Sequence, residues 1–190
     1  MNSPLKDGQS VIFMKVGLHA AESMEDIIKR KQREFENAGR IFWGYGGGAC
    51  HPRTMVQPFA KQAEANGQEL LIIMQRMNSR HPAPPVLAQQ YSNDGVDWED
   101  IPKGIEVRGS RFALVLDELR LEEFDVNLTQ FEVGYGRSRG KSAAAYIQGQ
   151  SDKGCLIYHE DDIPPPPEEK LVKRIGLVAR VLDPYAVFLR

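Results

Sequence analysis

The chain has 190 residues, of which 42% are hydrophobic and 26% charged, a composition typical of one globular domain. Its net charge of −2 and pI of about 6.1 exclude a strongly basic nucleic-acid-binding protein, although not a local basic patch. There is no signal-peptide-like run at the N-terminus, no stretch of the ~20 apolar residues that span a bilayer, and no disulfide framework with only two cysteines. We therefore expect a cytoplasmic protein without membrane partners or spans.

The first half of the chain predicts alternating strands and helices. Apolar runs predict strands at Val11–Val16, Arg40–Tyr45 and Leu70–Met74. Helices are expected over Ser23–Asn37 and Pro58–Asn66. Ser23 and Asp26 form a capping box at the start of the first helix, and Gly39 is suited to end it. The segment Asn78–Pro85 predicts a surface loop.

The second half predicts mainly strands between polar or glycine-rich turns. The expected strands are Val86–Gln90, Phe112–Leu119, Val126–Val133, Ala143–Gln148 and Cys155–Tyr158. Helices early and strands late predict an α+β fold, with a curved mixed sheet or partly open β-barrel and helices packed outside. We expect one domain over residues 1–160.

The C-terminal region begins with a run of prolines. Pro164–Pro167 predicts a polyproline II spacer, within a linker over residues 161–168. Residues 169–190 are apolar enough to pack back on the domain as a helix, or as a hairpin across Asp183-Pro184. This segment could also dock a protein partner or a second copy of the chain, so a protein-interaction module is one functional hypothesis.

A glycine-rich segment near Lys141 resembles a phosphate-binding loop only superficially. The pattern G-x-x-x-x-G-K-[ST] needs a glycine five residues before Gly140, but Gly134 and Gly136 lie on either side of that position. The same turn carries Arg137, Arg139 and Lys141, which could hold nucleic-acid phosphates or serve solubility alone.

Cysteine and histidine suggest two other chemistries, neither with a strong pattern. Cys50, His51, Cys155 and His159 lack the paired spacing of zinc sites, so we expect no metal. Cys50 with His51, or His159, could serve a small nucleotide-processing enzyme that also uses the glycine-rich loop, but no orienting acid is identifiable. We expect no catalytic residues and no cofactor.

The two tryptophans are the remaining candidates for a binding site. Trp43 and Tyr45 lie in an aromatic strand that runs into Gly46, Gly47 and Gly48, where the backbone can approach a ligand closely. Trp98 lies in a polar loop. Isolated tryptophans commonly pack in cores, but two indoles could also enclose a flat ring by stacking.

The order of these elements resembles the PUA-like superfamily, particularly its EVE and YTH branches, which read modified bases. The resemblance covers roughly Val11–Val133, from VIFMKVG through IFWGY and ELLIIMQR to FALVLDEL and DVNLTQFEV. It implies that Trp43 and Trp98 form an aromatic cage and that the partner is nucleic acid carrying a modified base. We therefore expect binding rather than catalysis, with Gly46–Gly48 against the base edge and the basic turn on the phosphates.

Overall fold

The structure, a computed structural model, describes residues 3–19, 22–46, 49–81, 86–148, 152–163 and 171–190. Its α-helices are α1 (Met24–Ala38), α2 (Gln57–Ala65) and α3 (Ala143–Gln148), with a π-helical turn η1 (Pro52–Val56) and a 3₁₀ turn η2 (Leu128–Gln130). Its strands are β1 (Ser10–His19), β2 (Ile41–Tyr45), β3 (Leu71–His81), β4 (Gln90–Ser92), β5 (Glu99–Asp100), β6 (Phe112–Leu116), β7 (Arg120–Asn127), β8 (Phe131–Val133), β9 (Lys153–Tyr158) and β10 (Val172–Leu189).

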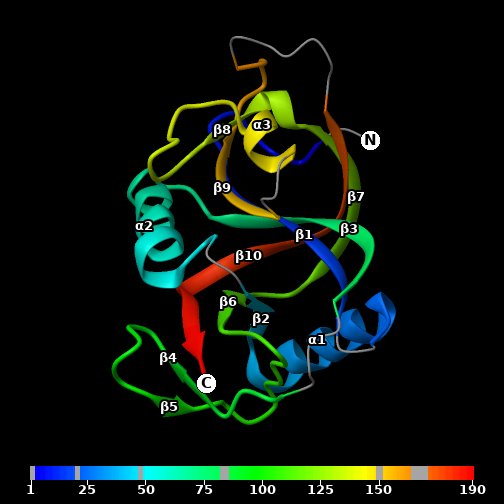
Figure 1. Ribbon diagram of the computed structural model, residues 1–190, viewed down its shortest axis with the longest axis vertical. Coiled ribbons are helices and arrows are strands. Elements are labelled where there is room, and N and C mark those ends of the chain that lie inside the picture. The colour runs from blue at the N-terminus through cyan, green and yellow to red at the C-terminus, as the bar shows by residue number, and fades with distance from the viewer. Residues whose placement is uncertain (1–2, 20–21, 47–48, 82–85, 149–151, 164–170) are drawn as a thin grey trace.

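All ten strands belong to one sheet, which confirms the expected mixed α+β class. The main path runs β2-β6-β10-β3-β1-β9-β8, with β4, β5 and β7 joined off this path. Among the described strands, only β1 and β3 pair in parallel, and the path is open, with β2 and β8 at its ends. The helices lie around the outside of the sheet (Figure 1). Among the described residues, no helix has both the length and the hydropathy to cross a membrane.

Helix α1 begins and ends where the sequence pattern predicts. The Ser23 hydroxyl accepts a hydrogen bond from the backbone N–H of Asp26 at 3.1 Å, which satisfies one of the free donors of the first turn. Gly39 follows the helix at φ 67°, a left-handed conformation in which glycine carries no penalty. The buried side of the helix contributes Met24, Ile27 and Ile28 to the core.

Strand β10 replaces the helix or hairpin expected near the C-terminus. It pairs with β3 and β7 in one half of the sheet and with β6 and β4 in the other. The register against β6 shifts between Val181 and Ala186, so that one long strand passes Pro184 and continues. The spacer predicted at Pro164–Pro167 lies outside the described residues. The segment from Val172 onward is therefore a central strand of the sheet (Figure 1).

Four other elements differ from the prediction. In place of the strand expected over Val86–Gln90, the structure has the short strand β4, which begins at Gln90. Ala143–Gln148 forms helix α3 rather than a strand, in line with the high helix propensity of its alanines. The strand expected over Val126–Val133 is divided by η2 into the end of β7 and β8. Strand β3 continues to His81, beyond the point at which a loop was expected, because it pairs with β1 along that length.

Candidate ligand-binding cavity at the edge of strand β2

A cavity of about 350 Å³ lies where β2, α1, β1 and the segment 106–110 meet. This volume is within the range of small-molecule sites in proteins. Trp43 and Tyr45 contribute aromatic surface to it, and Met14, Met24 and Met77 contribute thioethers. Its charged lining consists of Lys15, Arg30, Lys31, Arg108, Lys153, Glu106 and Asp152, with five cations and two carboxylates. The lining therefore combines aromatic and thioether surface with charged side chains of both signs.

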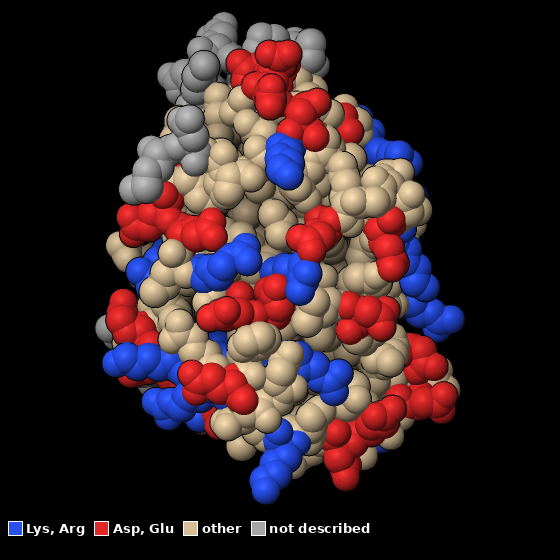
Figure 2. Space-filling view, turned by 180° about the vertical axis from the view of Figure 1, so that it is seen from behind, with Lys and Arg blue, Asp and Glu red and all other residues tan. Residues whose placement is uncertain are grey.

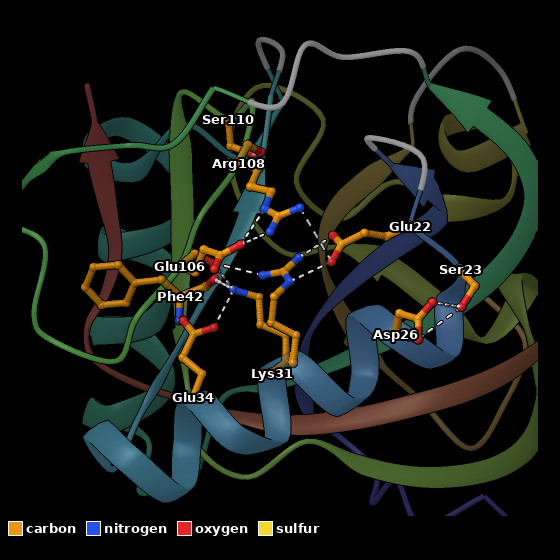
Figure 3. Close-up of polar contacts among 10 residues, drawn as sticks. Glu22, Ser23, Asp26, Lys31, Glu34, Phe42, Glu106, Arg108 and Ser110 are labelled. Carbon is orange, nitrogen blue, oxygen red and sulfur yellow. Dashed lines mark hydrogen bonds and ion pairs between the residues drawn. The ribbon is translucent and has the colours of Figure 1, made fainter.

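The edge of β2 next to the cavity is held by a buried ion pair on α1 (Figure 3). Lys31 Nζ lies 2.6 Å from Glu34 Oε2 and donates to the carbonyl oxygen of Phe42, also at 2.6 Å. Glu34 Oε1 accepts the backbone N–H of Phe42 at 3.0 Å. The two side chains thus take the place of a neighbouring strand and satisfy both backbone groups of Phe42.

Burial changes the protonation of this pair. The side chains of Lys31 and Glu34 are 4% and 1% exposed. Loss of water around the ammonium lowers the pKa of Lys31 to about 8, against an opposing effect of the Glu34 charge. Burial likewise raises the pKa of Glu34 above its ordinary value, although Lys31 and the Phe42 N–H oppose this. The ion pair therefore fixes α1 against β2 at an electrostatic cost.

A second ionic network connects α1 to the segment 106–110 (Figure 3). Arg30 binds both carboxylate oxygens of Glu22, at 2.9 and 2.8 Å, and donates to the carbonyl oxygen of Glu106 at 3.0 Å. Lys31 donates to the same carbonyl at 2.9 Å. Arg108 pairs with the Glu106 carboxylate and lies 3.8 Å from Glu22. The hydrogen bond from Arg30 lowers the pKa of Glu22, which lies behind this wall of the cavity.

Of the two tryptophans, Trp43 lines the cavity and Trp98 does not. Trp43 is 6% exposed and lines the cavity with Tyr45 and Gly46. Trp98 does not line it: it is partly exposed in the β4–β5 region, with the Arg190 guanidinium 4.1 Å from its ring centroid. Arg190 therefore occupies one face of Trp98. The expected Trp43–Trp98 cage is not formed around this cavity.

Of the three consecutive glycines, only Gly46 belongs to the described residues. Its carbonyl oxygen accepts a hydrogen bond from Lys153 Nζ at 3.2 Å, which connects the end of β2 to β9. Gly47 and Gly48, expected to contact a base, lie outside the described residues.

The basic turn lies apart from the cavity lining. Arg137, Arg139 and Lys141 are exposed on the connection between β8 and α3. The turn is closed by backbone hydrogen bonds, including Gly140 N–H to the carbonyl of Val133 at 2.8 Å. Elsewhere on the molecule, basic and acidic side chains alternate over the face seen in Figure 2. The turn thus remains a candidate phosphate contact, at a position outside the cavity.

Cys50 and Cys155 are brought together inside the core rather than at a surface. They are 1% and 2% exposed, and a contact with Cys50 raises the pKa of the Cys155 thiol. His51 packs edge-on against Phe112 and Phe188, with ring centroids 5.1 and 5.2 Å away. No cluster of three metal-ligating side chains occurs within the ranges that the structure describes. Because both thiols are buried, neither could readily reach a substrate as a nucleophile.

Several cavity residues could not be singled out from the sequence. Arg30 and Lys31 lie within the first predicted helix and, like Glu106 and Arg108, belong to no recognisable motif. The one local signal was the apolar stripe of α1, which showed the buried face but not that a lysine lies on it. Comparisons with protein-family models, curated proteins and solved structures found no match to the chain.

Proposed function

We propose that the chain is a PUA-like reader of a modified base in nucleic acid, and that it binds this base in the cavity beside Trp43. The cavity carries the proposal, because an aromatic wall lies beside Arg30, Lys31 and Arg108, which ion pairs hold in place. Stacking on an indole is worth about 1–3 kcal/mol for each base, and this offsets part of the cost of taking a base out of its stack.

The two tryptophans have different roles in this proposal. Trp43 provides the stacking surface, whereas Trp98 has Arg190 against its ring and lies outside the cavity. The phosphates of the strand would contact Arg137, Arg139 and Lys141, because the cations of the cavity are held in ion pairs. An overall charge of −2 does not oppose this, because binding depends on the local cations.

Single-tryptophan variants test the proposal directly, since the chain has only two tryptophans. Trp98→Phe leaves Trp43 as the only indole, and Trp43→Phe leaves Trp98. Each variant is titrated with short single-stranded DNA that contains one 5-methylcytosine or one N6-methyladenine, and with the unmodified strands. Indole fluorescence should be quenched by a modified strand in the Trp98→Phe protein and unchanged in the Trp43→Phe protein.

Affinity provides the second readout. Trp43→Leu should weaken binding of the modified strand about tenfold or more, while Trp98→Leu leaves it within twofold. Thermal melting curves establish that both variants are folded. Equal losses in the two variants, or binding of none of the modified strands, would show that the cavity is not a base-binding site.

A further inference from the structure

Strand β2 has one open position along its outer edge. The register pairs Phe42 with Val115 and Gly44 with Ala113 of β6. Because both backbone groups of Phe42 bond to α1, they point away from β6. Alternate residues of an antiparallel pair present the same side, so the N–H and C=O of Gly44 also point away from β6.

Lysine side chains bind the backbone carbonyls of the residues two positions before and two positions after Gly44. Lys31 holds the carbonyl of Phe42, and Lys153 holds the carbonyl of Gly46 at 3.2 Å. Within the described residues, neither backbone group of Gly44 has a side-chain or loop partner. Gly44 lines the cavity, between the aromatic residues Trp43 and Tyr45. Among the described residues, Gly44 therefore presents an unpaired donor and an unpaired acceptor to the cavity.

The choice of glycine at this position follows from the neighbouring segment. A Cβ atom at residue 44 would collide with Ser110 Oγ and would lie 2.9 Å from Val107 Cγ1. Any larger residue would push the segment 107–110 outward and change the cavity. Glycine lets this segment close over the strand while the backbone edge remains open.

We infer that Gly44 reads the edge of the bound ring, so that the cavity takes a planar heterocycle carrying an N–H donor beside an acceptor. The inference rests on the proposed function and names the chemical group that this site recognises. The N–H of Gly44 donates to a ring nitrogen or carbonyl oxygen of the ligand, and its C=O accepts the ligand N–H. A ligand that lacks the donor leaves the carbonyl unsatisfied in a confined site, which costs binding free energy.

Amide hydrogen exchange of the ligand-free, ¹⁵N-labelled chain tests the open edge. The Gly44 amide should exchange about tenfold or more faster than those of Trp43 and Tyr45, which face β6. Addition of the modified strand that binds should slow its exchange and move its proton resonance downfield. A Gly44 amide that is as protected as its neighbours in the free chain would overturn the inference.

Two comparisons of a base with an analogue that lacks its N–H donor test the role of the Gly44 carbonyl as an acceptor. The strand with 5-methylcytosine is compared with one carrying 5-methyl-2-pyrimidinone, which lacks the amino group, and N6-methyladenine is compared with N6,N6-dimethyladenine, which has no N–H. We expect each donor-deficient base to bind about tenfold or more weakly than its partner.

The outcomes separate the two proposals. Quenching of Trp43 by a modified strand, with equal affinity for the donor-deficient base, would keep the proposed function and overturn the role of Gly44. Binding of none of these strands overturns the proposed function, and this inference with it.

Discussion

Lys31 and Glu34 carry opposite charges where water is largely excluded, so each depends on the other. Lys31→Met should lower the free energy of unfolding by about 3–5 kcal/mol, because it leaves Glu34 buried without its cation and the Phe42 carbonyl without its donor. The double variant Lys31→Met/Glu34→Gln should recover much of this loss, since the amide oxygen can still accept the Phe42 N–H. Urea denaturation measures both, and equal stability of the single variant and wild type would contradict this.

The same pair predicts how stability varies with pH. From about pH 8 to pH 10.5, the unfolded chain keeps a proton on Lys31 that the folded chain has released, so stability rises with pH. Just above pH 4.5 the folded chain keeps a proton on Glu34 that the unfolded chain has lost, so stability falls as pH rises. The difference in unfolding free energy between wild type and the double variant should show both slopes. A difference that is independent of pH would mean that neither pKa is shifted.

The thiols allow a test of the enzyme hypothesis. Because Cys50 and Cys155 are almost completely buried, iodoacetamide should alkylate the native chain slowly at neutral pH and the urea-unfolded chain rapidly. Mass spectrometry of the alkylated peptides measures each rate. Rapid modification of Cys50 in the folded protein would instead favour a nucleophilic role.

Among the helices and strands, those whose ends are set by neighbouring residues were predicted best. The capping box at Ser23 and the glycine at residue 39 specified α1 without reference to the rest of the chain. In Ala143–Gln148, three alanines favoured a helix, but the apolar content was interpreted as a strand. Pro184 argued against a continuous strand, because proline cannot donate to a ladder, and the register shift beside it could not be anticipated.

The cavity was less predictable than the elements because it depends on contacts between distant segments. Trp43 was a candidate from the sequence, but the other cavity residues Arg30 and Arg108 come from a helix and from a segment far along the chain. The sequence contained no signal that Arg190 would stack on Trp98. Spacing alone therefore suggested a pair of tryptophans, of which Trp43 lines the cavity and Trp98 does not.

The basic turn between β8 and α3 predicts a salt dependence. Replacing Arg137, Arg139 and Lys141 by alanine should reduce the slope of log affinity against log salt by about 1–3, if the turn contacts one to three phosphates. The side chains are exposed, so the melting temperature should change little. Fluorescence titrations at several salt concentrations measure the slope, with Lys61→Ala as a control on a neighbouring helix. An unchanged slope would assign the turn to solubility.

For the whole molecule, the central question is whether the C-terminal segment is an appendage or part of the core. Strand β10 pairs with four other strands and buries Ile175, Leu177, Val178, Ala179, Val181, Ala186 and Val187. Its removal would expose the unpaired edges of β3 and β6 together with the apolar faces on both sides. This loss is far larger than the few kcal/mol by which a domain of this size is stable.

A chain that ends at residue 171 should therefore fail to fold cooperatively, in contrast to the loss of a docking tail, which would leave the domain intact. Circular dichroism during heating measures this, and the synthetic peptide 172–190 serves as a control, since adding it should restore part of the structure if the strand is required. A sharp melting transition of the truncated chain alone would contradict the argument.

Because truncation removes the fold, self-association has to be tested on the full chain, by sedimentation over a range of concentrations. A mass that increases with concentration would then reflect a surface of the folded domain rather than a free tail.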